Sequence, residues 1–392
     1  MAAESAINFE ALETQAGTLV ETFKRAGYEQ VAPAILQPAD IFLDQIGEAL
    51  RGRTYVFTDL TGEELCLRPD LTVPVSRLYL ERHPEAETEA RYCYNGPAFR
   101  FQPGGRSRVR PREFRQAGIE SFGVEDRDAA DAEMVMLATA AIQQAGLKDF
   151  SLRFGDIGLF FALLESLEIP ERWRRKLGHY FWRPSTFHHL LRRLSRGERP
   201  EAESPIAEFA RTLDLGDRTR AEEQVEAYLA ERDLPLTGNR SLSEITASLI
   251  DFAADLEAPP LAKEIATVID YYLAVSGKPE ECVGRLAMIA RGAGLDLDPS
   301  LDRLIRRFER LRESGLDLST AVFASDFGRN LEYYSGLVFQ IEVPALGEGS
   351  QIAGGGRYDG LLKALGAPRD LPAIGCAIHT ERLLAAVEAT AP

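Results

Sequence analysis

The sequence predicts an α+β fold in which one mixed sheet is interrupted by a helical insertion. Strand-like segments occupy the first part of the chain, helix-like segments follow, and strand-like segments return near the C-terminus. Strands, then helices, then strands again are typical of a sheet that the chain leaves and later re-enters. We therefore expect a core of residues 1–156 and 318–392, with a helical insertion of residues 157–317.

The first part of the core begins with an amphipathic helix. Apolar residues recur at helical spacing between residues 9 and 26, where Asn8 is placed to cap the helix and Gly27 to end it. The segment "DLTGE" (59–63) has the composition of a hairpin turn between two short strands. Strands are expected at residues 54–58, 64–68, 91–101 and 112–123.

The rest of the sequence predicts several helices followed by three more strands. Between residues 157 and 317, amphipathic pieces are separated by Pro and Gly, which favours several helices. Three more strands are expected at residues 335–343, 351–360 and 372–378, and a short amphipathic helix follows.

Composition limits the possible classes of protein. The 392 residues carry a formal net charge of −16, which disfavours nonspecific binding of nucleic acid. The four cysteines show neither metal-ligand spacing nor a disulfide framework, and we expect buried thiols in a reducing compartment. The N-terminus lacks the pattern of a signal peptide, and no apolar run reaches the roughly 20 residues that span a bilayer. We expect a cytoplasmic protein without membrane contact.

The segment "REFRQAGIESFG" (112–123) offers a polar strand face. Successive side chains of a strand alternate between its faces, so Gln116, Gly118 and Glu120 share one face. An amide and a carboxylate on either side of a glycine leave room for a ligand, because glycine in a strand often marks a close approach. An ordinary solvent-facing strand explains the same pattern.

Two further segments carry candidate ligand-binding groups. In "LCLRPDLTVPV" (65–75), Asp70 and Thr72 follow a proline and are placed either to bind an ammonium group or to cap a helix. Arg100 lies within an expected strand and is a candidate for binding a carboxylate, whereas the arginines of the loop that follows are better explained by solvation.

Two segments near the C-terminus are ambiguous. The glycines of "IAGGGRYDGLLKALG" (352–366) suit either a phosphate cradle or tight packing in a sheet, and the segment lacks the pattern of a P-loop. In "GRNLEYYSGLVFQ" (328–340), Arg329, Tyr333 and Tyr334 suit either a core or a pocket for a carboxylate and an aromatic ring.

Taken together, these segments resemble the catalytic core of histidyl-tRNA synthetases, which are class II aminoacyl-tRNA synthetases. The resemblance covers nearly the whole chain, with the helical insertion in the expected gap. Six segments match the family's motifs in order: "GYEQVAPAILQPADIF", "LRPDLTVPVSR", "GPAFRFQ" with "REFRQAGIESFG", "GRNLEYYSGLVFQ", "AGGGRYDGLL" and "AIGCAIHTERL".

The resemblance implies an antiparallel sheet of about six or seven strands flanked by helices, and a pocket for free histidine. Asp70 and Thr72 would hold the α-amino group of histidine, and Arg100 would face its carboxylate. Gln116 and Glu120 would add polar contacts on the same face. Four residues would close the pocket around the imidazole and the carboxylate: Arg329, Tyr333, Tyr334 and Tyr358. No metal or cofactor is implied.

The sequence departs from the synthetase pattern around the expected ATP site. Gln102 stands where the second motif normally carries an acid, and His379 stands where the third motif usually has glycine. Arg382 of the third motif is retained. Asp70 is one methylene shorter than the usual glutamate. We therefore expect a degenerate ATP site, because a synthetase must stabilise the charge that builds on the transferred phosphate.

The end of the sequence adds a further expectation. A synthetase of this kind continues for about 90–100 residues into an anticodon-binding domain, a size typical of a small domain. The sequence given stops earlier, and in this it resembles the regulatory subunits of ATP phosphoribosyltransferase, which are paralogues of the synthetase. The expected function is a non-catalytic subunit in histidine biosynthesis. The alternative is a minimal histidyl-tRNA synthetase, or another histidine-activating ligase.

The same resemblance implies the partners of the chain. They are the short-form catalytic subunit, in a hetero-octamer of four plus four chains, a second copy of the chain in a homodimer through the core, and L-histidine as the feedback inhibitor. We expect no tRNA partner.

Overall fold

The computed structural model describes residues 8–45, 51–102, 111–198, 203–234, 241–328 and 333–390. Two compact units make up the chain: Met1–Leu167 with Tyr271–Pro392, and Glu168–Asp270. The expected insertion boundaries at residues 157 and 317 stay a prediction. Arg329 and most of the arginine-rich loop lie outside the described residues.

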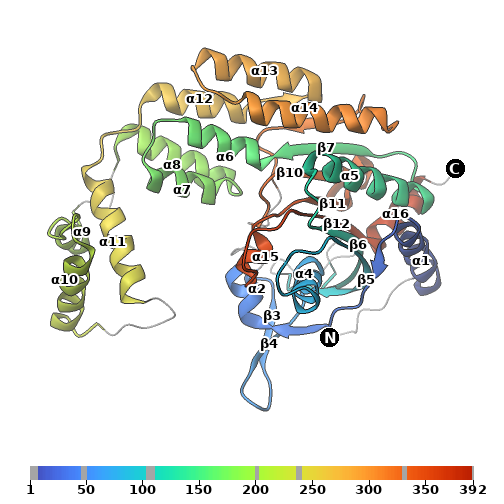
Figure 1. Cartoon of the computed structure of the whole chain (residues 1–392), viewed down its shortest axis with the longest axis horizontal. Coiled ribbons are helices and arrows are strands. Elements are labelled where there is room, and N and C mark those ends of the chain that lie inside the picture. The colour runs from blue at the N-terminus through green and yellow to red at the C-terminus, as the bar shows by residue number, and fades with distance from the viewer. Residues whose placement is uncertain are drawn as a thin grey trace. The chain divides into compact units, whose positions relative to one another are not determined.

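The first unit is built on a nine-stranded sheet (Figure 1), whose spatial order is β1-β5-β6-β12-β11-β10-β7-β9-β8. All neighbours pair antiparallel except β1 with β5 and β7 with β9. The strands are β1 (Glu29–Gln30), β5 (Ala90–Phe99), β6 (Glu113–Phe122), β7 (Ser151–Asp156), β8 (Ser276–Gly277), β9 (Val322–Ala324), β10 (Leu337–Glu342), β11 (Gln351–Arg357) and β12 (Ala373–His379). The sheet exceeds the six or seven strands expected because β1 at one end and β9 and β8 at the other add strands of only two or three residues.

A second, smaller sheet has the order β2-β4-β3, with β2 (Leu36–Pro38), β3 (Tyr55–Thr58) and β4 (Glu64–Leu67). The predicted hairpin between β3 and β4 is confirmed, because the Asp59 amide donates to the Glu63 carbonyl at 2.9 Å. Gly62 adopts a φ of 91°, which glycine reaches without the strain of a Cβ atom.

Three helices cover one face of the large sheet: α1 (Phe9–Arg25), α5 (Arg127–Gln144) and α16 (Thr380–Thr390). Asn8 caps α1 as predicted, since its side chain accepts from the Ala11 amide at 3.2 Å. Asp126 caps α5 in the same way, through the Ala129 amide at 3.0 Å. The other helices of this unit are α2 (Ala39–Gln45), α4 (Thr72–Arg82), α6 (Ile157–Ser166), α13 (Pro279–Gly292), α14 (Asp298–Glu313), α15 (Leu361–Ala364) and the 3-10 helix η1 (Pro344–Gly349).

The second unit holds only helices in its described residues, as the sequence pattern predicts. They are α7 (Glu171–Tyr180), α8 (Pro184–Arg196), α9 (Pro205–Ala210), α10 (Arg218–Glu231) and α11 (Leu242–Glu257), and α12 (Lys263–Leu273) begins in it. A buried carboxylate ties α11 to α7, because Asp255 accepts from the Trp173 indole at 2.6 Å and also pairs with Arg172 and Lys176.

All four cysteines are buried free thiols. Burial raises the pKa of Cys66 to about 12 and that of Cys93 to about 11, so both thiols stay protonated at neutral pH. Among the described helices, none combines the length and apolar character that crossing a bilayer requires.

Candidate functional site

Glu120 lies at the centre of the candidate site, on the face of the large sheet opposite α5. Two glycines make its position possible. Gly375 is its partner on β12, and a Cβ atom at Gly375 would overlap the Glu120 carboxylate. Gly118 lies two residues earlier on β6, and a Cβ atom there would overlap the Tyr94 hydroxyl. The glycines therefore let a carboxylate and a phenol lie flat across neighbouring strands.

Three hydroxyl groups donate to the Glu120 carboxylate. Thr72 Oγ1 and Tyr94 Oη reach Oε1 at 2.7 and 3.1 Å, and Tyr358 Oη donates to Oε2. The side chain is fully buried, and burial raises its pKa to about 8, although the three hydrogen bonds act in the opposite direction. A buried carboxyl of this kind gains most from a cation that arrives with the ligand.

Asp70 supplies a second buried carboxylate on the same side of the sheet. Its Oδ1 accepts from the Val73 amide at 3.3 Å, at the start of α4. Its Oδ2 is buried and has no hydrogen-bond partner among the described residues. Burial raises the pKa of Asp70, and the Arg100 guanidinium opposes that shift. The hydrogen bond to Oδ1 agrees with the helix-cap interpretation, and a ligand contact at Oδ2 stays a prediction.

Gln116, four positions before Glu120 on β6, also has a buried oxygen atom. Its side chain is buried, and Oε1 has no hydrogen-bond partner among the described residues. It pairs with His379 on β12 and with Gly96 on β5. Two acceptor atoms, Asp70 Oδ2 and Gln116 Oε1, are thus buried without protein donors, which makes both candidates for binding a polar ligand.

Tyrosine rings gather beside Glu120. The Tyr333 ring lies 5.7 Å from the Tyr358 ring, edge to face, and 4.8 Å from the Tyr334 ring. Tyr334 and Tyr358 are buried and Tyr333 is half-buried. The three rings form an apolar wall next to a carboxylate, an arrangement that suits a ligand with both an aromatic ring and a charged group.

His379, expected at the ATP site, and Arg100, expected in the histidine pocket, both lie near the ring of Phe114. The His379 imidazole lies 5.1 Å from the Phe114 ring, and the Arg100 guanidinium lies 5.0 Å from the same ring. Arg100 Nε also donates to the Pro69 carbonyl at 2.8 Å, which holds it beside Asp70.

Gln102 and Arg382 are bonded to other parts of the protein. Gln102 Oε1 accepts from Arg53 at 2.5 Å, and its Nε2 donates to the Pro111 carbonyl at 3.0 Å. Arg382 donates to the Gln351 carbonyl at 3.0 Å. These hydrogen bonds go to Arg53, Pro111 and Gln351, and none of them goes to Glu120 or Asp70.

Sequence reasoning missed one member of the site, Tyr94. Its signal was available, because the predicted strands 91–101 and 112–123 pair antiparallel with Tyr94 opposite Gly118. A large side chain opposite a glycine fills the space that the glycine leaves. Choosing this register from the sequence alone required the turn between the strands, which lies outside the described residues.

The glycine-rich segment is explained by packing. A Cβ atom at Gly355 would overlap the Gly375 carbonyl, and one at Gly356 would lie 2.7 Å from the Leu337 carbonyl. The helix that follows, α15, has four residues. Of the two interpretations of this segment, tight packing of strands is the one that the contacts support.

Comparison with known families defines the class of protein. The sequence model described as "Histidyl-tRNA synthetase" matches residues 6–186 and 250–383, which is most of the chain. The expected class II synthetase-like fold is confirmed.

Curated relatives narrow the class to one family. An ATP phosphoribosyltransferase regulatory subunit from Agrobacterium fabrum is 35% identical over 94% of this chain and 96% of its own length. The corresponding subunit from Brucella anthropi is 32% identical over 91% of this chain and 92% of its own. The chain belongs to the family of ATP phosphoribosyltransferase regulatory subunits.

Solved structures support the fold. A protein from Bacillus halodurans described as an ATP phosphoribosyltransferase regulatory subunit/histidyl-tRNA synthetase has a TM-score of 0.66 and 20% identity, and the match covers 99% of this chain and 81% of that one. A histidine–tRNA ligase subunit from Alicyclobacillus acidocaldarius has a TM-score of 0.61 and 23% identity, with 99% and 96% covered.

Proposed function

We propose that this chain is a non-catalytic subunit that binds free histidine and conveys its concentration to a short-form catalytic subunit of ATP phosphoribosyltransferase. Membership of the family supports the regulatory role. The single observation that carries the ligand assignment is the buried pair of carboxyl groups, Glu120 and Asp70, beside the ring of Tyr358. A cationic amine with an aromatic ring fits this set of groups.

The proposed contacts follow from the chemistry of each group. Asp70 Oδ2 accepts from the α-ammonium group of histidine, because it is a buried acceptor without a protein donor among the described residues. Arg100, held beside Asp70, faces the carboxylate. Glu120 and Gln116 add polar contacts, while Tyr333, Tyr334 and Tyr358 enclose the imidazole, and Arg329 belongs to the same proposal by resemblance.

The proposed loss of ATP chemistry is supported by the surroundings of Phe114. The His379 ring and the Arg100 guanidinium both lie within about 5 Å of its centroid, which leaves less of that aromatic surface for an adenine. Gln102 is neutral where the synthetase pattern has an acid, and its amide is bonded to Arg53 and Pro111. A site without the acid cannot place the charges that activating a carboxylate requires.

A homodimer through the core is the proposed assembly of this chain with itself. The small sheet supports it, because residues two apart on a strand share a face. One face of this sheet is entirely apolar, and its members are Leu36, Pro38, Tyr55, Phe57, Leu65 and Leu67. Leu36 and Phe57 are 50% and 41% exposed. A second copy would cover this face, since large exposed apolar patches mark interaction sites.

The test uses two measurements, one on the purified chain and one on the chain co-expressed with its proposed partner. Calorimetry with histidine, with and without ATP, should give saturable histidine binding that ATP does not alter. Co-expression with a short-form ATP phosphoribosyltransferase should give a complex, proposed to be four plus four chains, that is active and is inhibited by histidine. Histidine-dependent exchange of pyrophosphate into ATP by the chain alone would instead support the alternative, a histidine-activating ligase.

Residue variants give the ligand test its control. Replacing Glu120 with alanine should abolish histidine binding, because it removes the acceptor of three hydroxyl groups. Replacing Glu133 with alanine should leave binding unchanged, because Glu133 forms a partly exposed ion pair with Arg91. Unchanged histidine affinity in the Glu120 variant would make the pocket assignment wrong.

A further inference from the structure

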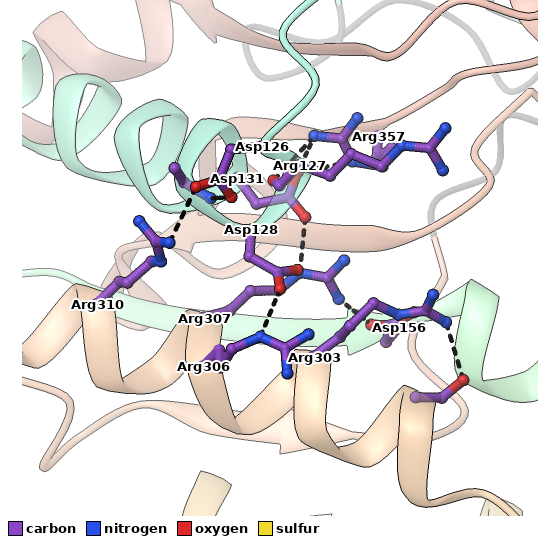
Figure 2. Close-up of polar contacts among 12 residues, drawn as sticks. Asp126, Arg127, Asp128, Asp131, Asp156, Arg303, Arg306, Arg307, Arg310 and Arg357 are labelled. Carbon is purple, nitrogen blue, oxygen red and sulfur yellow. Dashed lines mark hydrogen bonds and ion pairs between the residues drawn. The ribbon is translucent and has the colours of Figure 1, made fainter.

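A network of buried ion pairs lies on the opposite face of the sheet from the proposed pocket. Figure 2 shows arginines of α14 pointing toward the aspartates at the start of α5, with Arg357 above them. Asp131 is fully buried between two arginines. Arg357 of β11 reaches its Oδ1 at 2.6 Å, and Arg307 of α14 reaches its Oδ2 at 2.7 Å.

Arg307 makes α14 part of this network. Its guanidinium also pairs with Asp156, at the end of β7, at 2.6 Å, and with Asp128 at 3.2 Å. The arginine is 5% exposed, so its charge is neutralised by protein carboxylates rather than by water. Arg307 therefore pairs with three acids on two elements, of which Asp131 also pairs with Arg357 and Asp128 with Arg306.

Arg357 connects the network to the pocket. The next residue is Tyr358, whose hydroxyl donates to Glu120 on the other face of the sheet. Adjacent residues of an extended segment point to opposite faces, so fixing Arg357 fixes the backbone that carries Tyr358. Arg357 also pairs with Asp359 at 2.9 Å, so charged contacts hold the segment on both sides of the tyrosine.

The same arginine supports the neighbouring pocket segment. The Ser335 amide donates to the Arg357 carbonyl at 2.8 Å, directly after Tyr333 and Tyr334. A Cβ atom at Gly336 would lie 3.2 to 3.4 Å from the aliphatic part of the Arg357 side chain. Arg357 thus contacts the segment that follows two of the tyrosines and directly precedes the third.

We propose that Arg357 positions Tyr358 for the amino-acid pocket, and that α14 controls this positioning through Arg307, which shares the carboxylate of Asp131. The inference rests on the proposed function, in which the pocket binds histidine. A shift of α14 removes one of the two cations on Asp131, which changes the charge balance of the carboxylate that Arg357 binds through two nitrogen atoms. Ligand affinity and the position of α14 are consequently coupled, in both directions.

The experiment compares two arginines on the same helix. Arg307→Lys keeps a positive charge but loses the planar guanidinium, which hydrogen-bonds Asp156 through Nη1 and lies within 3.2 Å of Asp128 and Asp131 through Nε. Arg310→Lys is the matched control, because Arg310 forms a single, partly exposed pair with Asp126, on the loop before α5. Calorimetry with L-histidine should show a Kd raised about two- to thirtyfold in the Arg307 variant and unchanged in the control.

A double-mutant cycle separates positioning from general stability. In a Tyr358→Phe background the effect of Arg307→Lys on the histidine Kd should fall below about twofold, because the hydroxyl to be positioned is gone. A lowered unfolding midpoint with an unchanged Kd, or an effect that persists fully in the Tyr358→Phe background, would overturn the proposal.

Hydrogen exchange of the ligand-free chain gives a readout that does not depend on histidine. The Tyr358 amide donates to the Ala373 carbonyl at 2.8 Å, and its exchange should accelerate in Arg307→Lys but not in Arg310→Lys. If the wild-type chain fails to bind histidine, the proposed function is wrong. The exchange result then decides by itself whether α14 positions this segment, and equal exchange in both variants would reject the proposal.

Discussion

The raised pKa of Glu120 predicts that the ligand-free chain loses stability as the pH rises. The folded-state pKa is about 8 and the ordinary value is 4.5, so between these pH values the folded state binds the extra proton. Stability falls with pH wherever the folded state binds more protons than the unfolded state. At about 1.4 kcal/mol per pH unit, the full contribution is on the order of 5 kcal/mol, present below pH 4.5 and lost as the pH passes 8.

The assay is denaturant unfolding at a series of pH values from 5 to 9, with Glu120→Gln beside the wild type. Glutamine keeps the shape of the side chain and cannot ionise, so the variant should lack most of this decline. Glu133→Gln, at a partly exposed ion pair, should decline like the wild type. If the Glu120 variant shows the same pH dependence as the wild type, the titration of Glu120 is not its source and the reasoning is refuted.

Three further predictions concern the same pocket. Histidine binding should release protons between about pH 6 and 8, because the ligand ammonium favours ionised Glu120; equal calorimetric enthalpies in buffers of different ionisation enthalpy would contradict this. Gly375→Ala should destabilise the chain by about 2 kcal/mol or more, because the methyl group overlaps the Glu120 carboxylate. Gly284→Ala, in helix α13 with open space around it, should be neutral or stabilising by up to about 1 kcal/mol, and an equal loss in both would remove the steric argument. Tyr94→Phe should weaken histidine binding by about 1 kcal/mol, because one of three donors to Glu120 is lost; an unchanged Kd would place Tyr94 outside the binding machinery.

The predicted elements with strong local signals were found. The capped first helix, the β3–β4 hairpin, the strands on either side of the arginine-rich loop and the three C-terminal strands all lie where periodicity and turn residues placed them. Five strands were not predicted: β1, β2, β7, β8 and β9. Four of them have two or three residues, too few to show alternation, and they form because a neighbouring strand pairs with them. β7 has six residues, but its last three are all buried, so it does not alternate along its length.

The site was predictable in its residue types but not in its connections. Alternation placed Gln116 and Glu120 on one face, and the structure adds that Thr72 and Tyr358 donate to the same carboxylate. The sequence could not decide whether Asp70 caps a helix or meets a ligand, because the surroundings of its two oxygens depend on the tertiary structure. Oδ1 accepts from the Val73 amide, whereas Oδ2 is buried without a hydrogen-bond partner among the described residues. Arg307 and Asp131 carried no signal, since an ion pair across 176 positions leaves no local pattern.

The three donors to Glu120 have a consequence for the order of folding. Thr72 and Tyr94 precede the carboxylate, whereas Tyr358 lies 238 positions after it, beyond the whole helical unit. Closing so long a loop is slow, and a fragment that ends before Tyr358 cannot complete the set. A nascent polypeptide can therefore form all three hydrogen bonds only after Tyr358 has been synthesised and the two halves of the sheet have joined.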